Sequence, residues 1–199
     1  MTINIQELQR IIRTGLFSLA NSLASYCPSN GNKGMAERNL IGHVASAFLA
    51  NGFAAYFEVP LAGGTEVDGT AGQVDALFIS HQHELFIVVE AKKLHGAGKA
   101  NEIIREIDRI NAFELQEQNI DIQKSYGLIL WETWAPEIVN SWNSSNDPLD
   151  PNGDLRKQLQ ELKDKILEVE AITLQRNLIR NSKKDRYEVH KGLYALWSR

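Results

Sequence analysis

The 199-residue chain is poor in cysteine, and its single Cys27 excludes both an internal disulfide framework and a zinc site built from cysteines. No apolar run is long enough for a transmembrane helix, and the N-terminus lacks the basic start and apolar run of a signal peptide. A phosphate-binding Gly-Lys-Ser/Thr loop and a dinucleotide fingerprint are also missing, so we expect no ATP or NAD dependence. These absences predict a protein of the reducing cytoplasm that binds neither a membrane nor a nucleotide cofactor.

The chain also lacks an excess of positive charge, since its formal net charge is −4. That value is unusual for a protein that binds nucleic acid by charge alone. The charge is unevenly distributed, however, because residues 171–199 carry seven basic and two acidic side chains, which leaves +5 there and −9 on the rest. A basic tail on an acidic body is typical of a phosphate-contacting element, although a solvated surface helix gives the same composition.

The chain is organised around Gln73–Leu94, QVDALFISHQHELFIVVEAKKL, in which two apolar segments flank a short polar linker. The segments Val74–Ser80 and Leu85–Ala91 are rich in β-branched and aromatic residues, and the linker has the length of a hairpin turn. Asp75 lies near the start of the first segment, and Glu90 lies near the end of the second. Antiparallel pairing therefore predicts that these two carboxylates lie side by side.

Lys92 completes a group of charges that an apolar hairpin would normally exclude. Because side chains alternate along a strand, Glu90 and Lys92 project from the same face. Two anions and a cation at one end of an apolar hairpin are costly unless a ligand compensates them, and a divalent cation would do so. Lys92 could instead pair with Glu90 or Asp75 as a structural bridge, but such bridges rarely add much stability, so we favour a functional site.

The order Asp75, then Glu90-Ala91-Lys92 at the end of an apolar strand, resembles the signature of PD-(D/E)XK nucleases. The preceding stretch KGMAERNLIGHVASAFLANGFAAYFEVP resembles the opening helix and first strand of archaeal Holliday-junction resolvases and related restriction-endonuclease-like proteins. The resemblance covers residues 33–132 and departs from the signature at Val74, where the signature has a proline that family members often lack. It implies an α/β fold with an α-β-β-β-α-β core, a mixed central sheet flanked by helices, and extra N- and C-terminal helices.

The resemblance further implies a Mg²⁺-dependent endonuclease that hydrolyses phosphodiester bonds of DNA, with Mn²⁺ as a substitute metal. Asp75, Glu90 and the backbone carbonyl of Ala91 would bind the metal, and Lys92 would orient the attacking water or steady the developing charge. Glu37 matches a helix carboxylate that joins the metal site in the family. In the first turn of a helix, Glu37 is equally explained by complementing the helix dipole. The alternative function is a catalytically silent nuclease-fold module that binds a nucleic acid or a protein.

Helical spacing and apolar runs predict the remaining elements. The expected helices are Asn4–Ser25, Gly34–Asn51 with Gly52 as its stop, and Asn101–Gln118, and the expected further strands are Ala54–Leu61 and Tyr126–Trp131. We therefore divide the chain into an N-terminal helix (1–30), a nuclease-like core (31–146) and a C-terminal helix with a basic, aromatic tail (147–199). His81 and His83 in the hairpin turn are interpreted as solvent-facing loop residues.

The C-terminal part begins with the Pro- and Gly-containing boundary at residues 147–153. Leu155, Leu159, Leu162, Ile166 and Val169 then follow heptad spacing over about two heptads, which is too short to establish a coiled coil. This helix covers its own domain or forms the seam of a homodimer, and Tyr187–Trp197 is expected to add a strand. Residues expected to contact nucleic acid are the basic side chains near the core helix and in the tail: Lys33, Arg38, Lys183, Lys184 and Arg186.

Overall fold

A computed structural model describes residues 3–25, 37–60, 72–94, 97–115, 122–133, 170–179 and 186–199 of the chain. The predicted heptad helix, Lys33, Lys183 and Lys184 lie outside these ranges. The elements are α1 (Ile5–Ser25), α2 (Glu37–Leu49), β1 (Ala54–Pro60), β2 (Gln73–Ser80), β3 (Leu85–Lys93), α3 (Ala97–Ala112), β4 (Lys124–Thr133), β5 (Glu170–Ile179) and β6 (Arg186–Ser198).

The strands form one mixed six-stranded sheet in the order β1-β2-β3-β4-β6-β5. β1, β2 and β3 form an antiparallel meander, and β4 pairs parallel to β3. A parallel neighbour requires a crossover connection, which α3 supplies between β3 and β4. The predicted α/β class, mixed sheet and succession of a helix, three strands, a helix and a strand are therefore confirmed.

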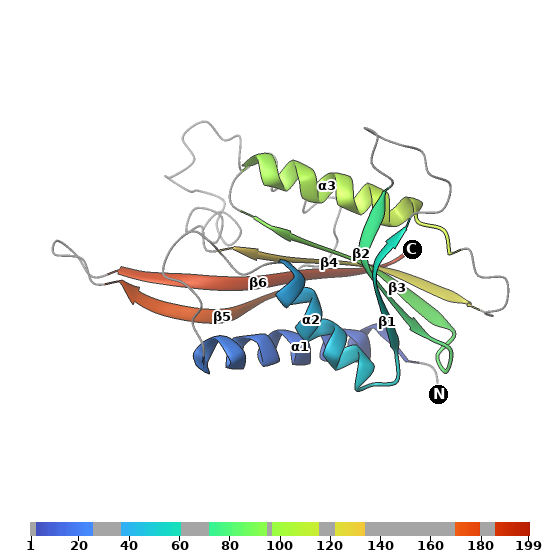
Figure 1. Cartoon of the computed structure of the whole chain (residues 1–199), viewed down its shortest axis with the longest axis horizontal. Coiled ribbons are helices and arrows are strands. Elements are labelled where there is room, and N and C mark those ends of the chain that lie inside the picture. Colours follow the sequence, from blue (N-terminus) through green and yellow to red (C-terminus); the bar gives the residue numbers. More distant parts are fainter. Residues whose placement is uncertain are drawn as a thin grey trace.

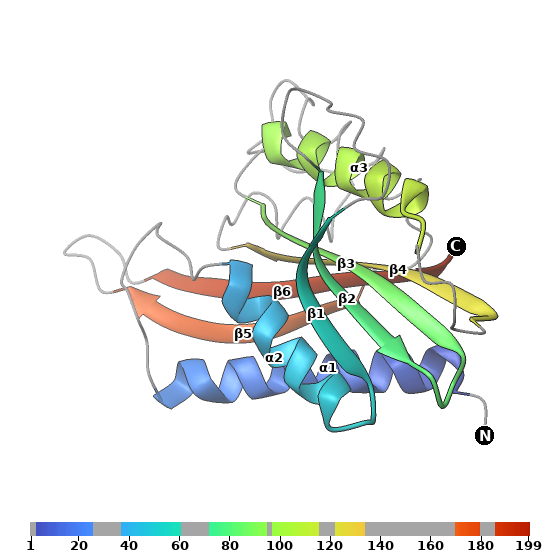
Figure 2. The same ribbon diagram turned by 45° about the vertical axis from the view of Figure 1, so that its right-hand side comes forward.

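Helices cover both faces of the sheet and make three layers (Figures 1 and 2). α1 and α2 lie on one face, where their apolar sides share a core with inward residues such as Phe78, Val89 and Leu128. α3 lies on the other face and packs Ile103, Ile107 and Ile110 against residues such as Val88 and Ile129. The continuous apolar runs of β3 and β4 follow from this arrangement, since a strand covered on both faces exposes neither set of its side chains.

The end of α2 shows how local sequence fixes a boundary. Gly52 adopts a positive φ of 81°, and the N–H groups of Gly52 and Phe53 bond to the carbonyls of Leu49 and Phe48. This is the Schellman arrangement, and the Phe53 ring contacts the Phe48 ring edge-on at a centroid distance of 5.0 Å. The predicted helix stop at Gly52 is confirmed.

The apolar stripe of α1 is buried within the chain. Its residues Leu8, Ile12, Leu16 and Leu19 are at most 1% exposed and belong to the core shared with α2. The guanidinium of Arg13 binds the Glu170 carboxylate of β5 with an Nε–Oε1 distance of 2.8 Å. The apolar stripe of the predicted N-terminal helix therefore packs within the chain's own core.

Two predicted boundaries require correction. α3 begins at Ala97 and ends at Ala112, so it starts before the predicted Asn101 and ends before Gln118. The basic tail is not a surface helix where the structure describes it, because residues 170–179 and 186–198 form β5 and β6. The strand predicted at Tyr187–Trp197 is confirmed as β6. Among the helices in the described ranges, none is long and apolar enough to cross a membrane.

Candidate active site

The candidate site lies where β2 and β3 separate. Their pairing ends at Ala76 opposite Val89, whereas β3 continues along β4 as far as Lys93 opposite Glu132. Beyond Val89, the edge of β3 that faced β2 therefore has no strand partner among the described strands. The N–H groups of alternate residues on this edge need other acceptors, because unpaired backbone groups away from water are costly.

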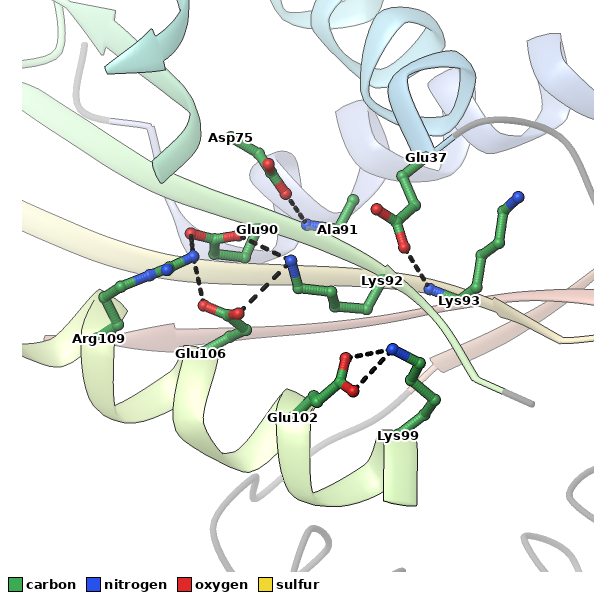
Figure 3. Close-up of polar contacts among 10 residues, drawn as sticks. All are labelled: Glu37, Asp75, Glu90, Ala91, Lys92, Lys93, Lys99, Glu102, Glu106 and Arg109. Atoms are coloured by element: carbon green, nitrogen blue, oxygen red, sulfur yellow. Dashed lines mark hydrogen bonds and ion pairs between the residues drawn. The ribbon is translucent and has the colours of Figure 1, made fainter. Parts of the chain in front are cut away.

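Two carboxylates from different elements supply these acceptors (Figure 3). Asp75 of β2 accepts a hydrogen bond from the Ala91 N–H, with an N–Oδ2 distance of 2.8 Å. Glu37, in the first turn of α2, accepts one from the Lys93 N–H at an N–Oε1 distance of 2.9 Å. Both side chains thus occupy the place that a neighbouring strand would take.

A local distortion turns β1 and β2 away from β3 at this point. Along β2, Ala76 packs toward α1 and α2 whereas Val74 packs toward α3, although strict alternation would place both on one face. The same change occurs along β1, where Glu58 has a φ of +54°. Such a conformation costs a non-glycine residue about 1–3 kcal/mol and is typical of functional sites. Asp75 lies at this distortion, which explains why its side chain reaches the edge of β3.

Glu90 lies on the α3 face and is fully buried. Its Oε1 accepts a hydrogen bond from Arg109 Nη2 at 2.5 Å, while its Oε2 makes no hydrogen bond within the described residues. Burial, helped by the neighbouring carboxylates of Asp75 and Glu106, raises the pKa of Glu90 from 4.5 to about 9, and Arg109 opposes this shift only in part.

Lys92 lies beside Glu90, as the strand alternation predicted. Its Nζ is 3.9 Å from Glu90 Oε2 and 3.4 Å from Glu106 Oε1. Burial alone would lower the pKa of Lys92, but the surrounding carboxylates, with Glu106 the strongest, outweigh burial and raise it. Lys92 therefore carries a positive charge at neutral pH.

Glu106 and Arg109 were not predicted as site residues. They project from α3 and contact each other as an i,i+3 pair, and Figure 3 shows them facing Glu90 and Lys92. The available signal was their position, since Glu106 directly precedes the buried Ile107 and Arg109 directly precedes the buried Ile110 on a helix that follows the charged strand end. A polar pair beside an apolar helix stripe indicates that the two side chains border the face turned to the sheet, but it does not show which strand residues they meet.

The structure brings Asp75, Glu90, Ala91 and Lys92 together, while Glu37 lies two residues further along β3, at Lys93. Arg38 is well exposed and forms an ion pair with Glu58, with an Nη2–Oε1 distance of 2.5 Å. Arg186 belongs to β6, and its side chain is outside the described set.

Two other basic residues of the tail are bound within the fold. Lys191 donates a hydrogen bond to Thr173, and Arg199 lies over the rings of Phe86 and Phe113. Arg199 also donates to the backbone carbonyl of Asn111 in the last turn of α3 and to that of Phe113 just after it. These two side chains therefore stabilise the sheet and the end of α3.

The oxygen atoms at the point where β2 separates from β3 fit a hard divalent cation. Glu90 Oε2 is a buried carboxylate oxygen without a hydrogen bond to the described residues, and the Asp75 carboxylate is close enough to raise the pKa of Glu90. The Ala91 carbonyl points to the same strand edge as its N–H, toward Asp75. Mg²⁺ binds through one or two carboxylates and keeps several waters. Within the described ranges, no group of three His, Cys, Asp or Glu side chains is placed to hold a metal ion.

Two further features lie outside this group. Glu132 and His190 form a buried pair with an Oε2–Nε2 distance of 2.8 Å, and it joins β4 to β6. A cavity of about 400 Å³ lies between β1, β2 and the residues after α3, with the half-exposed aromatic rings of Tyr56 and Phe57 in its lining. Neither feature includes a predicted site residue.

The comparisons with known proteins supply no relative. No protein-family model matches the chain, and neither a curated protein nor a solved structure matches it. The functional conclusion therefore rests on the geometry and chemistry of the residues described above.

Proposed function

We propose that this protein is a metal-dependent endonuclease that hydrolyses phosphodiester bonds of DNA, built on a restriction-endonuclease-like core. The observation that carries the proposal is the Asp75–Glu90 pair beside Lys92, at the point where β2 separates from β3. The order α2-β1-β2-β3-α3-β4 supports it, because the resemblance in sequence implies the same order.

Each residue has a defined part in this proposal. Asp75, the Oε2 of Glu90 and the carbonyl of Ala91 would hold the cation. When bound, Mg²⁺ supplies charge neutralisation at the phosphate and a more acidic water. Lys92, charged and adjacent to Glu90, would orient the attacking water and stabilise the negative charge that develops on the phosphate. Glu37 holds the N–H of Lys93 and so fixes the strand on which Lys92 lies.

The test is cleavage of branched, duplex and single-stranded DNA, with and without Mg²⁺ and with Mn²⁺ as a substitute. We expect wild-type protein to cut at least one substrate only when metal is present. Asp75→Ala and Glu90→Ala should abolish cleavage, and Lys92→Ala should reduce it while metal still binds. Glu102→Gln is the matched control, because Glu102 is a carboxylate on α3 that pairs with Lys99. Wild-type rates for both carboxylate variants would refute the assignment.

One observation favours a second candidate, a catalytically silent binding module. Arg109 and Lys92 place two positive charges against Glu90 and Glu106, so this part of the site is compensated by the chain's own cations. A folded protein that cuts neither DNA nor RNA with either metal would support this candidate.

We also propose that the protein acts as a homodimer, since two active sites are needed to cut two strands and two-fold symmetry would match that of the substrate. The stripe of α1 is buried within the chain, which leaves the predicted helix at residues 155–169 as the seam. The basic residues of the tail would then contact the same DNA from both subunits.

A further inference from the structure

The α3 residue Glu106 stands between the two cations of the site. Its Oε1 is 3.4 Å from Lys92 Nζ, and its Oε2 contacts Arg109 Nη2. The Glu106 side chain is only 13% exposed, so its charge is poorly screened by solvent. Among the described carboxylates, Glu106 shares both Lys92 and Arg109 with Glu90 (Figure 3).

The resulting distances are unequal around Glu90. Arg109 is at hydrogen-bond distance from Oε1, whereas Lys92 is 3.9 Å from Oε2. An ammonium group in free contact with a carboxylate settles at about 2.7–2.9 Å. Lys92 lies nearer to Glu106, at 3.4 Å, than to Glu90, and Oε2 keeps no hydrogen bond within the described residues.

We infer that Glu106 is a positioning residue that holds Lys92 away from Glu90 and so keeps Oε2 open for the cation. The inference rests on the cation-binding part of the proposed function and does not require cleavage. Without the charge of Glu106, Lys92 closes onto Oε2 and competes with the metal. Arg109 contributes by occupying Oε1, which fixes the orientation of the Glu90 carboxylate.

The experiment measures Mn²⁺ binding by the electron paramagnetic resonance signal of the free ion. We expect Glu106→Gln to weaken binding at least about tenfold, which is the effect of removing an outer-shell partner of a metal ligand. The matched control is Glu102→Gln, the same substitution one turn earlier on α3, and it should bind Mn²⁺ as the wild type does.

Repeating the Glu106→Gln substitution in a protein that lacks the Lys92 ammonium group distinguishes the positioning of Lys92 from a simple loss of negative charge near the metal. In Lys92→Gln protein no ammonium can close onto Glu90, so adding Glu106→Gln should change Mn²⁺ affinity by less than about twofold. An equal loss in both backgrounds would overturn the inference, as would unchanged affinity in the single variant. If Glu106→Gln does not fold, Glu106→Asp keeps the charge but withdraws it by one methylene, and its affinity should still fall.

The outcome is distinguishable from failure of the proposed function. Wild-type protein that binds Mn²⁺ but cuts no nucleic acid would remove the nuclease proposal and leave the role of Glu106 open to the same measurement. Wild-type protein that binds no Mn²⁺ would overturn the inference itself. Cleavage with unchanged affinity in Glu106→Gln protein would overturn the inference and leave the nuclease proposal standing.

Discussion

Glu90 carries the largest electrostatic cost among the site residues, because its carboxylate is fully buried next to Asp75 and Glu106. A buried ionised carboxylate is stable only when cations or hydrogen bonds compensate it. Arg109 compensates Oε1, and the proposed cation would compensate Oε2. In metal-free protein, we therefore expect Glu90 to make folding stability depend on pH.

The direction follows from its pKa, which is about 9 in the folded protein against an ordinary 4.5. Between these values the folded state holds a proton that the unfolded chain releases. The contribution of Glu90 is therefore fully present below pH 4.5 and is lost as pH rises through about 9. Glu90→Gln removes this dependence, so in the presence of EDTA its melting temperature should exceed that of the wild type most clearly at about pH 9. Thermal unfolding followed by circular dichroism across this range, with Glu102→Gln as control, tests the expectation. An unchanged pH slope would show that Glu90 is already ionised in the metal-free fold.

Asp75 was expected beside Glu90 from hairpin pairing, but that pairing ends at Ala76 and Val89, and the distortion of β2 brings the Asp75 carboxylate to the edge of β3 instead. Glu90 and Lys92 were predictable as neighbours because side chains alternate along a strand. Glu106 and Arg109 were not, because the rotation of α3 about its axis over the sheet is set by packing and not by spacing. The hydrogen bond of Glu37 to the Lys93 N–H was not predictable either. It exists because β3 continues beyond its pairing with β2, which ends at Val89 opposite Ala76, and nothing in the alternation of apolar residues marks that end.

Among the helices, the contact of α1 with α2 depends on a glycine. A Cβ at Gly15 would lie 2.6 Å from the Cα of Val44 and 2.9 Å from the carbonyl oxygen of His43. These are backbone atoms that cannot rotate away. Gly42, on the neighbouring helix, has open space for a side chain, since no atom of the described residues lies within 4 Å of a Cβ placed there.

The two glycines therefore predict opposite effects of the same substitution. Gly42→Ala should stabilise the protein by about 1 kcal/mol, because alanine favours a helix interior over glycine by that amount. Gly15→Ala gains the same preference but forces the helices apart, and overpacking of a core typically costs about 1–3 kcal/mol. Its net effect should be destabilising. Urea unfolding of both variants measures the difference, and equal stabilisation by both would show that α1 does not pack tightly on α2.

The elements of the core were largely predictable, since long amphipathic stripes and apolar runs are the strongest local signals. β5 was not predicted. Its sequence, from Glu170 to Ile179, is polar at many positions, and it is a strand because β6 provides a hydrogen-bonding partner along its length. A strand that is stabilised mainly by pairing with another strand need not show a clear strand pattern in its own sequence.

At the scale of the assembly, the proposed homodimer can be tested directly by measuring the mass of the protein in solution. Light scattering after gel filtration should give a mass twice the 22.4 kDa of one chain at micromolar concentration. Replacing Leu159 and Ile166 with Glu should return it to one chain, because buried apolar seams do not tolerate unpaired charge. DNA affinity and its salt dependence should then fall together, since half of the phosphate contacts are lost. A mass of one chain for the wild type would exclude the dimer and leave the site proposal unaffected.

The position of β6 in the sheet bears on how the protein is synthesised. β6 pairs with β4 on one side and β5 on the other, although β5 precedes it along the chain. A nascent chain emerges N-terminus first, so β4 leaves the ribosome long before residues 186–198. Until then one edge of β4 is an open template for pairing with other chains, and β5 lacks its partner. The meander and the carboxylates of the site can assemble early, but the sheet that supports them closes only when β6 arrives.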